Sequence, residues 1–277
     1  MLTAECCTRG VVSRLGCRYN RTFAHGASAM SSTPAAAQTA LPALSETQRI
    51  VNTFIAPSRT FTDLRRNPRW WAPWIVLAIA FVAFIAVIDQ KVGFDQIART
   101  MTANSSRAAQ IEQLPPDQRA QQYERIARFT RVLSYASPVT TLIVYLIVAA
   151  VLMGTFRFGA GAEIGYKTSL AIVMYSALPF VVSALLGILS LSAGANPESF
   201  NLNNPVASNP AYFMDMAGNK FFYTLASALD VFVIWCIVLM AIGFARNSKL
   251  RVDTCFTVIA SWYLLWKLIA AGLALLS

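Results

Sequence analysis

The sequence has little charge and only one histidine, His25. Charged residues make up 13% of its 277 positions, against about 25% in an ordinary soluble protein. One histidine is too few for a histidine-based metal site or a histidine-dependent catalytic triad. None of the five cysteines belongs to a CxxC pair, so the pattern indicates neither a zinc site nor a disulfide framework. We therefore expect no metal, no cofactor and no enzymatic activity.

Long apolar runs take up much of the remaining sequence. Hydrophobic residues reach 56% and the mean hydropathy is +0.51. A helix needs about 20 apolar residues to cross about 30 Å of hydrocarbon, and the runs are too long and too regular for barrel strands. The sequence thus predicts an all-α, polytopic helical membrane protein with five transmembrane helices and short amphipathic interfacial helices. The predicted spans cover residues 71–88, 138–156, 169–191, 222–244 and 254–276.

Basic residues outnumber acidic ones, 23 against 13, which gives a net charge of +10. In a membrane protein this excess indicates topology and contact with anionic lipid head groups rather than nucleic-acid binding. Lys and Arg gather before the first span, between spans two and three, and between spans four and five. The distribution predicts a cytoplasmic N-terminus and an external C-terminus, in the plasma (inner) membrane if the protein is bacterial. The segment 89–137 is also basic, although this topology places it outside.

The first 45 residues differ in composition from the rest. They contain one acidic residue, Glu5, together with several arginines and a stretch rich in Ser, Thr, Ala and Pro. This composition predicts disorder, and two interpretations stay open: an organellar transit peptide, or an extension before a true start at Met30. We divide the sequence into a disordered basic leader, residues 1–45, and a five-span membrane domain, residues 46–277.

An amphipathic segment leads into the first span. Ser45 and Gln48 have the spacing of a capping box at a helix start. Phe61 and Leu64 share one face of the next helix, and Arg59 can reach lipid phosphates, a pattern typical of a helix on the cytoplasmic leaflet. The basic and aromatic residues that follow are the expected interfacial anchors: Arg65, Arg66, Arg69, Trp70, Trp71 and Trp74.

Three residues inside the predicted spans need a physical explanation. Pro179 removes an intrahelical hydrogen bond, so we expect a kink, with Ser176 or a neighbouring helix satisfying the freed carbonyl. Asp230 and Lys267 place charges in spans four and five, and each costs about 2.5 to 3.5 kcal/mol at the bilayer centre. Because the two residues lie at nearly the same depth of adjacent antiparallel helices, they can form an intramembrane ion pair.

Three interpretations of Asp230 and Lys267 stay open. The pair can fix the register of the two helices, form a proton- or ion-coupled site, or make no contact, with the lysine reaching outward along its stem. An intramembrane aspartyl protease needs two facing carboxylates, and the predicted spans contain only Asp230 well inside.

Five short motifs carry a family resemblance: FIAPSRTF at 54–61, NPRWW at 67–71, YSALP at 175–179, DVFVIW at 230–235 and AIGF at 241–244. With the order and spacing of the five spans, they resemble the bacterial branch of the Yip-domain family, which are Rab-interacting-protein-like five-span membrane proteins. The resemblance covers roughly residues 46 to 277. It implies a five-span helical fold with a cytoplasmic N-terminus, and it brings no catalytic residue. Eukaryotic members are Golgi and ER membrane proteins that bind prenylated Rab-type GTPases.

These features favour a non-catalytic integral membrane protein that acts as a scaffold or as a trafficking and organisation factor. The alternative is a small transporter or lipid-translocating protein that uses intramembrane polar residues, among them Asp230, Lys267 and Ser176. The expected partners are a bilayer with anionic head groups and either other proteins or further copies of this chain, but no nucleic acid.

Overall fold

The computed structural model describes residues 42–105, 107–194, 196–215 and 218–274, and in these ranges it contains helices and no strand. Ala43–Ser277 form one compact unit. Most of the leader, including Met30, lies outside the described residues. The α-helices are α1 (Glu46–Ile55), α2 (Pro57–Asp63), α3 (Trp71–Lys91), α4 (Phe94–Ala103), α5 (Ala108–Glu112), α6 (Pro116–Tyr135), α7 (Ser137–Gly154), α8 (Tyr166–Ser176), α9 (Pro179–Ser192), α10 (Lys220–Ala226), α11 (Val231–Ser248) and α12 (Val252–Ala274).

Five helical segments in the described part of the chain are long and apolar enough to cross a membrane. This confirms the predicted all-α architecture with five spans, and the protein is a multi-pass membrane protein. The segments are Trp71–Lys91, Ser137–Gly159, Tyr166–Ser192, Val231–Ser248 and Val252–Ala274.

The fourth span begins at Val231, later than the residue 222 that the apolar run suggested. Asp230 has an extended backbone, and its side chain accepts hydrogen bonds from the amides of Phe232 and Val233. It is therefore the N-cap of α11 and not a charge within a helix. The preceding apolar residues form α10 and a 3-10 turn, Ser227–Leu229.

The third span, formed by α8 and α9, is the most deeply buried of the five. α8 packs against α7 and α11, whereas α9 packs against α3. α12 packs on α11 and is the least buried span, so most of its surface remains for lipid.

A glycine lets α11 approach its neighbours closely. A Cβ atom at Gly243 would lie 2.5 Å from Ile172 Cγ2 of α8 and 3.0 Å from the ring of Phe61 in α2. Phe61 and Leu64 are fully buried in the core of the bundle, although their pattern predicted a lipid-facing surface. The difference arises because α2 packs against α11, so these two side chains contact protein instead of lipid.

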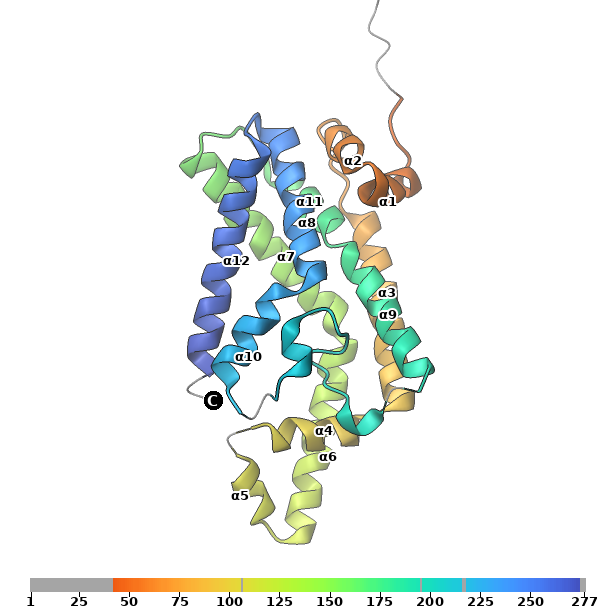
Figure 1. The fold of residues 1–277 in the computed structure, drawn as a ribbon. Coiled ribbons are helices and arrows are strands. Elements are labelled where there is room, and N and C mark those ends of the chain that lie inside the picture. Colours follow the sequence, from red (N-terminus) through yellow and green to blue (C-terminus); the bar gives the residue numbers. More distant parts are fainter. Residues whose placement is uncertain (1–41, 106, 195, 216–217, 275–277) are drawn as a thin grey trace, which may run out of the picture. The chain divides into compact units, whose positions relative to one another are not determined.

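Short helices lie at both ends of the bundle (Figure 1). α1 and α2 lie at the end where α7 connects to α8 and α11 to α12, which we call the α1–α2 side. α4, α5 and α6 lie at the opposite end, the α4–α6 side, together with the last turns of α12. The capping box at the start of α1 is confirmed: Ser45 Oγ accepts from the Gln48 amide at 3.2 Å, and Gln48 Oε1 accepts from the Ser45 amide at 3.0 Å.

Candidate functional site

A polar cavity of about 390 Å³ lies towards the α4–α6 side of the bundle. Its walls come from α9, α10, α11, α12 and the loop 203–209, and both Asp230 and Lys267 line it. We call it the Asp230–Lys267 cavity. The two residues therefore lie around one cavity, but their contacts differ from those expected.

Asp230 ties the loop 203–209 to the start of α11. Its Oδ1 accepts from the amides of Phe232 at 2.9 Å and Val233 at 3.1 Å. Its Oδ2 accepts from the Asn209 side-chain amide at 3.2 Å and from the Ser208 hydroxyl. Since a carboxylate offers about four lone-pair positions, these four bonds occupy Asp230 fully.

Two buried asparagines continue this network. Asn209 donates to Asn204 Oδ1 at 2.8 Å, and Asn204 donates back to Asn209 Oδ1 at 3.1 Å. The Tyr223 hydroxyl accepts from Asn201 at 3.1 Å and from Asn204 at 3.3 Å. Sequence reasoning missed these residues because an Asn- and Pro-rich segment reads as a loop, and only the fold shows which amides are buried.

Lys267 does not form the expected direct ion pair with Asp230. Among the described residues, no contact of 4.0 Å or less joins their charged atoms, whereas Lys267 Nζ donates to Ser227 Oγ at 3.0 Å. The ammonium also lies 5.9 Å from the ring centre of Tyr263, whose hydroxyl donates to the Ala228 carbonyl. The physical reason is that backbone amides and loop side chains already satisfy Asp230.

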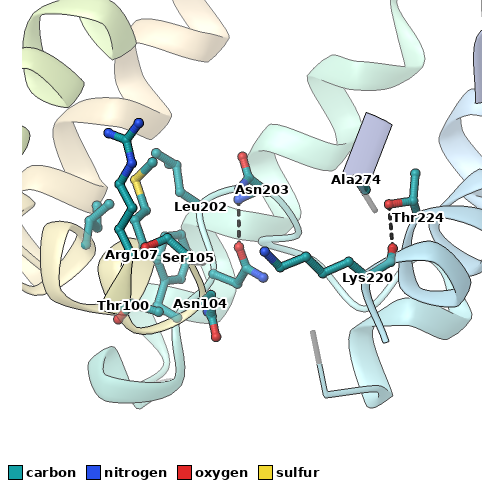
Figure 2. A pocket seen from close by; sticks show the side chains of 13 residues that line it. Thr100, Asn104, Ser105, Arg107, Leu202, Asn203, Lys220, Thr224 and Ala274 are labelled. Atoms are coloured by element: carbon teal, nitrogen blue, oxygen red, sulfur yellow. Dashed lines mark hydrogen bonds between the residues drawn. The ribbon is translucent and has the colours of Figure 1, made fainter. Parts of the chain in front are cut away.

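A larger pocket of about 570 Å³ borders this cavity on the α4–α6 side, with Asn203 and Thr224 lining both. Lys220 and Arg107 contribute two cations from different elements, and the rest of the lining mixes amide and hydroxyl groups with apolar side chains such as Ile97, Met101 and Phe200. Figure 2 shows Lys220 extending from the start of α10 towards the loop around Asn203, with Arg107 on the opposite wall. Such a set of donors suits an anion such as a phosphate head group.

On the α1–α2 side, a buried charge network holds the two short helices to the bundle. Arg49 is 2% exposed and pairs with Asp63 Oδ2 at 2.7 Å and with Glu46 Oε1 at 3.3 Å. Tyr175 of α8 donates to Glu46 Oε2 at 2.7 Å. Burial alone would lower the pKa of Arg49, but the hydrogen bond to Asp63 and the charges of Glu46 and Asp63 raise it. The guanidinium therefore stays charged.

Only part of this charge network can be predicted from the sequence. Glu46 and Arg49 stand three residues apart in the first helix, which is a local signal. The partners Asp63 and Tyr175 lie 14 residues from Arg49 and 129 from Glu46. Only the packing of α1, α2 and α8 brings them together.

The expected interfacial anchors lie between α2 and the first turn of α3. Trp74 Nε1 donates to the Pro138 carbonyl at 3.3 Å, and Trp70 and Trp74 pack partly against the core. Trp71 is 47% exposed, and Arg69 contacts Glu46 Oε1 at 3.5 Å. Arg65 and Arg66 are exposed at the same end. Membrane anchoring by these residues stays a prediction.

The third span is interrupted at Pro179. α8 ends at Ser176, and α9 begins at Pro179 as its first residue, where the missing amide costs no helical bond. Ser176 does not fill the role we expected, because its buried Oγ has no hydrogen-bond partner among the described residues.

The described residues hold no group of three or more His, Cys, Asp and Glu side chains that could bind a metal ion. Cys236 and Cys255 are both buried and not in disulfides.

Comparison with known proteins identifies the family. The model of the Yip1 domain matches residues 51–275, a range that contains all five spans and the residues that line both pockets described above. Searches of curated proteins and of solved structures found no match. The match covers most of the chain and confirms the Yip-domain resemblance, whereas the bacterial branch stays a prediction. The chain belongs to the Yip1 domain family.

Proposed function

We propose that the protein is a non-catalytic membrane scaffold, or a trafficking and organisation factor, that binds a protein partner on α1 and α2. The observation that carries this proposal is the docking of these two helices on the bundle through Arg49, Asp63, Glu46 and Tyr175. A hairpin held in one position presents a preorganised surface, and preorganisation lowers the entropic cost of binding.

The outward surface of this hairpin has the composition of a binding site. Val51 is 50% exposed and Ile55 is 75% exposed, although both lie outside the five spans. Arg59, Arg65 and Arg66 add positive charge nearby. An apolar centre with a charged rim is typical of protein interfaces.

The charge distribution supports a cytoplasmic position for this surface. Arg157 and Lys167 lie at the ends of the second and third spans that meet on the α1–α2 side, and Lys249 lies in the connection between α11 and α12. Short basic loops are retained in the cytoplasm. We therefore place α1 and α2 in the cytoplasm and the C-terminus outside.

Site-specific photocrosslinking in the native membrane tests the proposal. A photoreactive residue at Ile55 is expected to yield a discrete crosslinked protein, identified by mass spectrometry. The same residue at Ile79, which is 65% exposed on the lipid-facing span α3, is the matched control and is expected to yield none.

A second variant tests whether the crosslink depends on the docking of the α1–α2 hairpin on the bundle. Tyr175→Phe removes the hydrogen bond to Glu46 but keeps the ring, so it should loosen the hairpin and lower the Ile55 crosslink at equal expression. Absence of any protein crosslink at Ile55, or equal crosslinks at Ile55 and Ile79, would contradict the scaffold proposal.

A small transporter or lipid-translocating protein is the second candidate function. The Asp230–Lys267 cavity supports it, because polar groups at membrane depth commonly mark a substrate path. Flux of solute or labelled lipid in liposomes that is lost with Lys267→Met would favour it over the scaffold.

A further inference from the structure

An apolar groove of about 390 Å³ lies within the membrane-spanning part of the bundle. Its walls come mainly from α7, α8, α11 and α12, and almost all of its lining surface is apolar. Trp262 and Trp266 of α12 and Ile147 of α7 line it and are also exposed on the outside of the bundle. The groove is therefore accessible from the surrounding lipid. We call it the α7–α12 groove.

The groove borders the Asp230–Lys267 cavity. Phe180 and Val233 line both spaces, so the apolar groove ends where the polar cavity begins. Tyr263 lines the groove, and its ring faces the ammonium group of Lys267. An apolar groove that leads to the half-buried ammonium of Lys267 matches the polarity of a lipid, whose acyl chain is apolar and whose phosphate is charged.

Lys267 keeps the capacity to bind a ligand. Ser227 accepts one hydrogen bond from its ammonium, which leaves two of its three N–H groups. These two N–H groups do not bond to Asp230, because the carboxylate of Asp230 already accepts four hydrogen bonds from other groups of the protein. The charges of Lys267 and Asp230 sum to zero in the cavity, which favours a phosphodiester lipid over a more highly charged ligand.

Ser176 provides a second, independent sign of a ligand. It is fully buried, it lines the α7–α12 groove, and its hydroxyl has no partner in the described part of the chain. Buried hydroxyls in apolar surroundings are almost always hydrogen-bonded, to protein or to another molecule. On rotation of its side chain towards the groove, this hydroxyl can donate to the ester carbonyl of a lipid, an acceptor that a membrane supplies.

We propose that the Asp230–Lys267 cavity and the α7–α12 groove together bind one phospholipid. The phosphate accepts hydrogen bonds from Lys267 Nζ, one acyl chain lies in the groove, and an ester carbonyl accepts from Ser176 Oγ. This site is separate from the partner surface on α1 and α2, so either proposal can fail without the other.

Native mass spectrometry of the full chain in a non-ionic detergent tests the inference. The probes are phosphatidylcholine, diacylglycerol with the same acyl chains, and glycerophosphocholine, which has no chains. Phosphatidylcholine should bind about tenfold more tightly than diacylglycerol, the effect of one hydrogen bond to a charged group. It should also bind more tightly than glycerophosphocholine, which has no acyl chain to bury in the groove. Equal binding of diacylglycerol would show that the phosphate is not recognised, and equal binding of glycerophosphocholine would show that the groove plays no part.

Substitutions locate the site. Lys267→Met removes the ammonium, keeps most of the length of the side chain and should weaken phosphatidylcholine binding about tenfold. Lys91→Met, at an exposed lysine that ends α3, is the matched control and should leave binding unchanged. Met240→Trp adds volume to the groove without touching Lys267 and should also weaken binding. Equal effects of the two lysine substitutions, or unchanged binding in Met240→Trp, would overturn the inference.

Discussion

At the scale of single residues, the most consequential side chain of the α1–α2 side is Arg49. A buried ion pair adds little to stability compared with an apolar pair of the same shape, but breaking it leaves a buried charge without a partner. Asp63 is 8% exposed, so it has little access to water once Arg49 is removed. The network therefore restricts how α1 and α2 can dock more than it strengthens the fold.

This argument predicts the effect of Arg49→Met. The free energy of unfolding should fall by about 3 to 5 kcal/mol, because Asp63 and Glu46 lose their shared cation. Unfolding in mixed detergent micelles, followed by circular dichroism, provides the measurement. Arg128→Met is the control, since the Arg128–Glu124 pair is exposed and should contribute less than about 1 kcal/mol.

A double substitution separates the buried charge from the general effect of mutation. In Arg49→Met with Asp63→Leu, neither charge is present, so much of the lost stability should return. If the two losses add without recovery, the Arg49–Asp63 pair is not the reason for the destabilisation.

At the scale of helices, the junction of α2, α8 and α11 depends on the absence of a side chain at Gly243. Phe61 and Ile172 occupy the space that a Cβ would need, so three helices from distant parts of the sequence meet at one glycine. A stripe of small residues in the sequence indicates that helices can approach, but not which neighbour fills the gap.

Gly243→Ala is therefore expected to destabilise the protein by about 1 to 3 kcal/mol through overpacking. Gly272→Ala in α12 is the matched control, because a Cβ atom at this position would meet no heavy atom within 4 Å and alanine favours a helix. The same unfolding measurement compares both. A loss in Gly272→Ala as large as that in Gly243→Ala would show that close packing at Gly243 is not the cause.

At the scale of the whole molecule, local hydropathy sufficed to predict the five spans. Each span is a continuous apolar run, and burial in lipid requires no knowledge of the neighbouring helix. The start of the fourth span was wrong because the apolar run continues through residues 222–229, where tertiary packing forms α10 instead.

The polar contacts were harder to predict. Lys267 and Asp230 were placed near one another from helix length alone, but their partners Ser227, Ser208 and Asn209 depend on how a loop folds back. The Arg49 network joins residues far apart in the sequence for the same reason. Depth in the membrane follows from the sequence, whereas the choice of partner follows from the fold.

One span, α3, separates α1 from α6 and places them on opposite faces of the membrane, and this predicts a labelling pattern. In a variant with its five cysteines replaced, single cysteines are introduced at Ile55 and at Phe129, which are 75% and 69% exposed. A membrane-impermeant maleimide should label Phe129→Cys in intact cells and Ile55→Cys only after permeabilisation. Ile79→Cys, on the lipid-facing side of α3, should stay unlabelled in both conditions. Labelling of Ile55→Cys and Phe129→Cys from the same side would contradict the five-span topology, and with it the cytoplasmic partner surface.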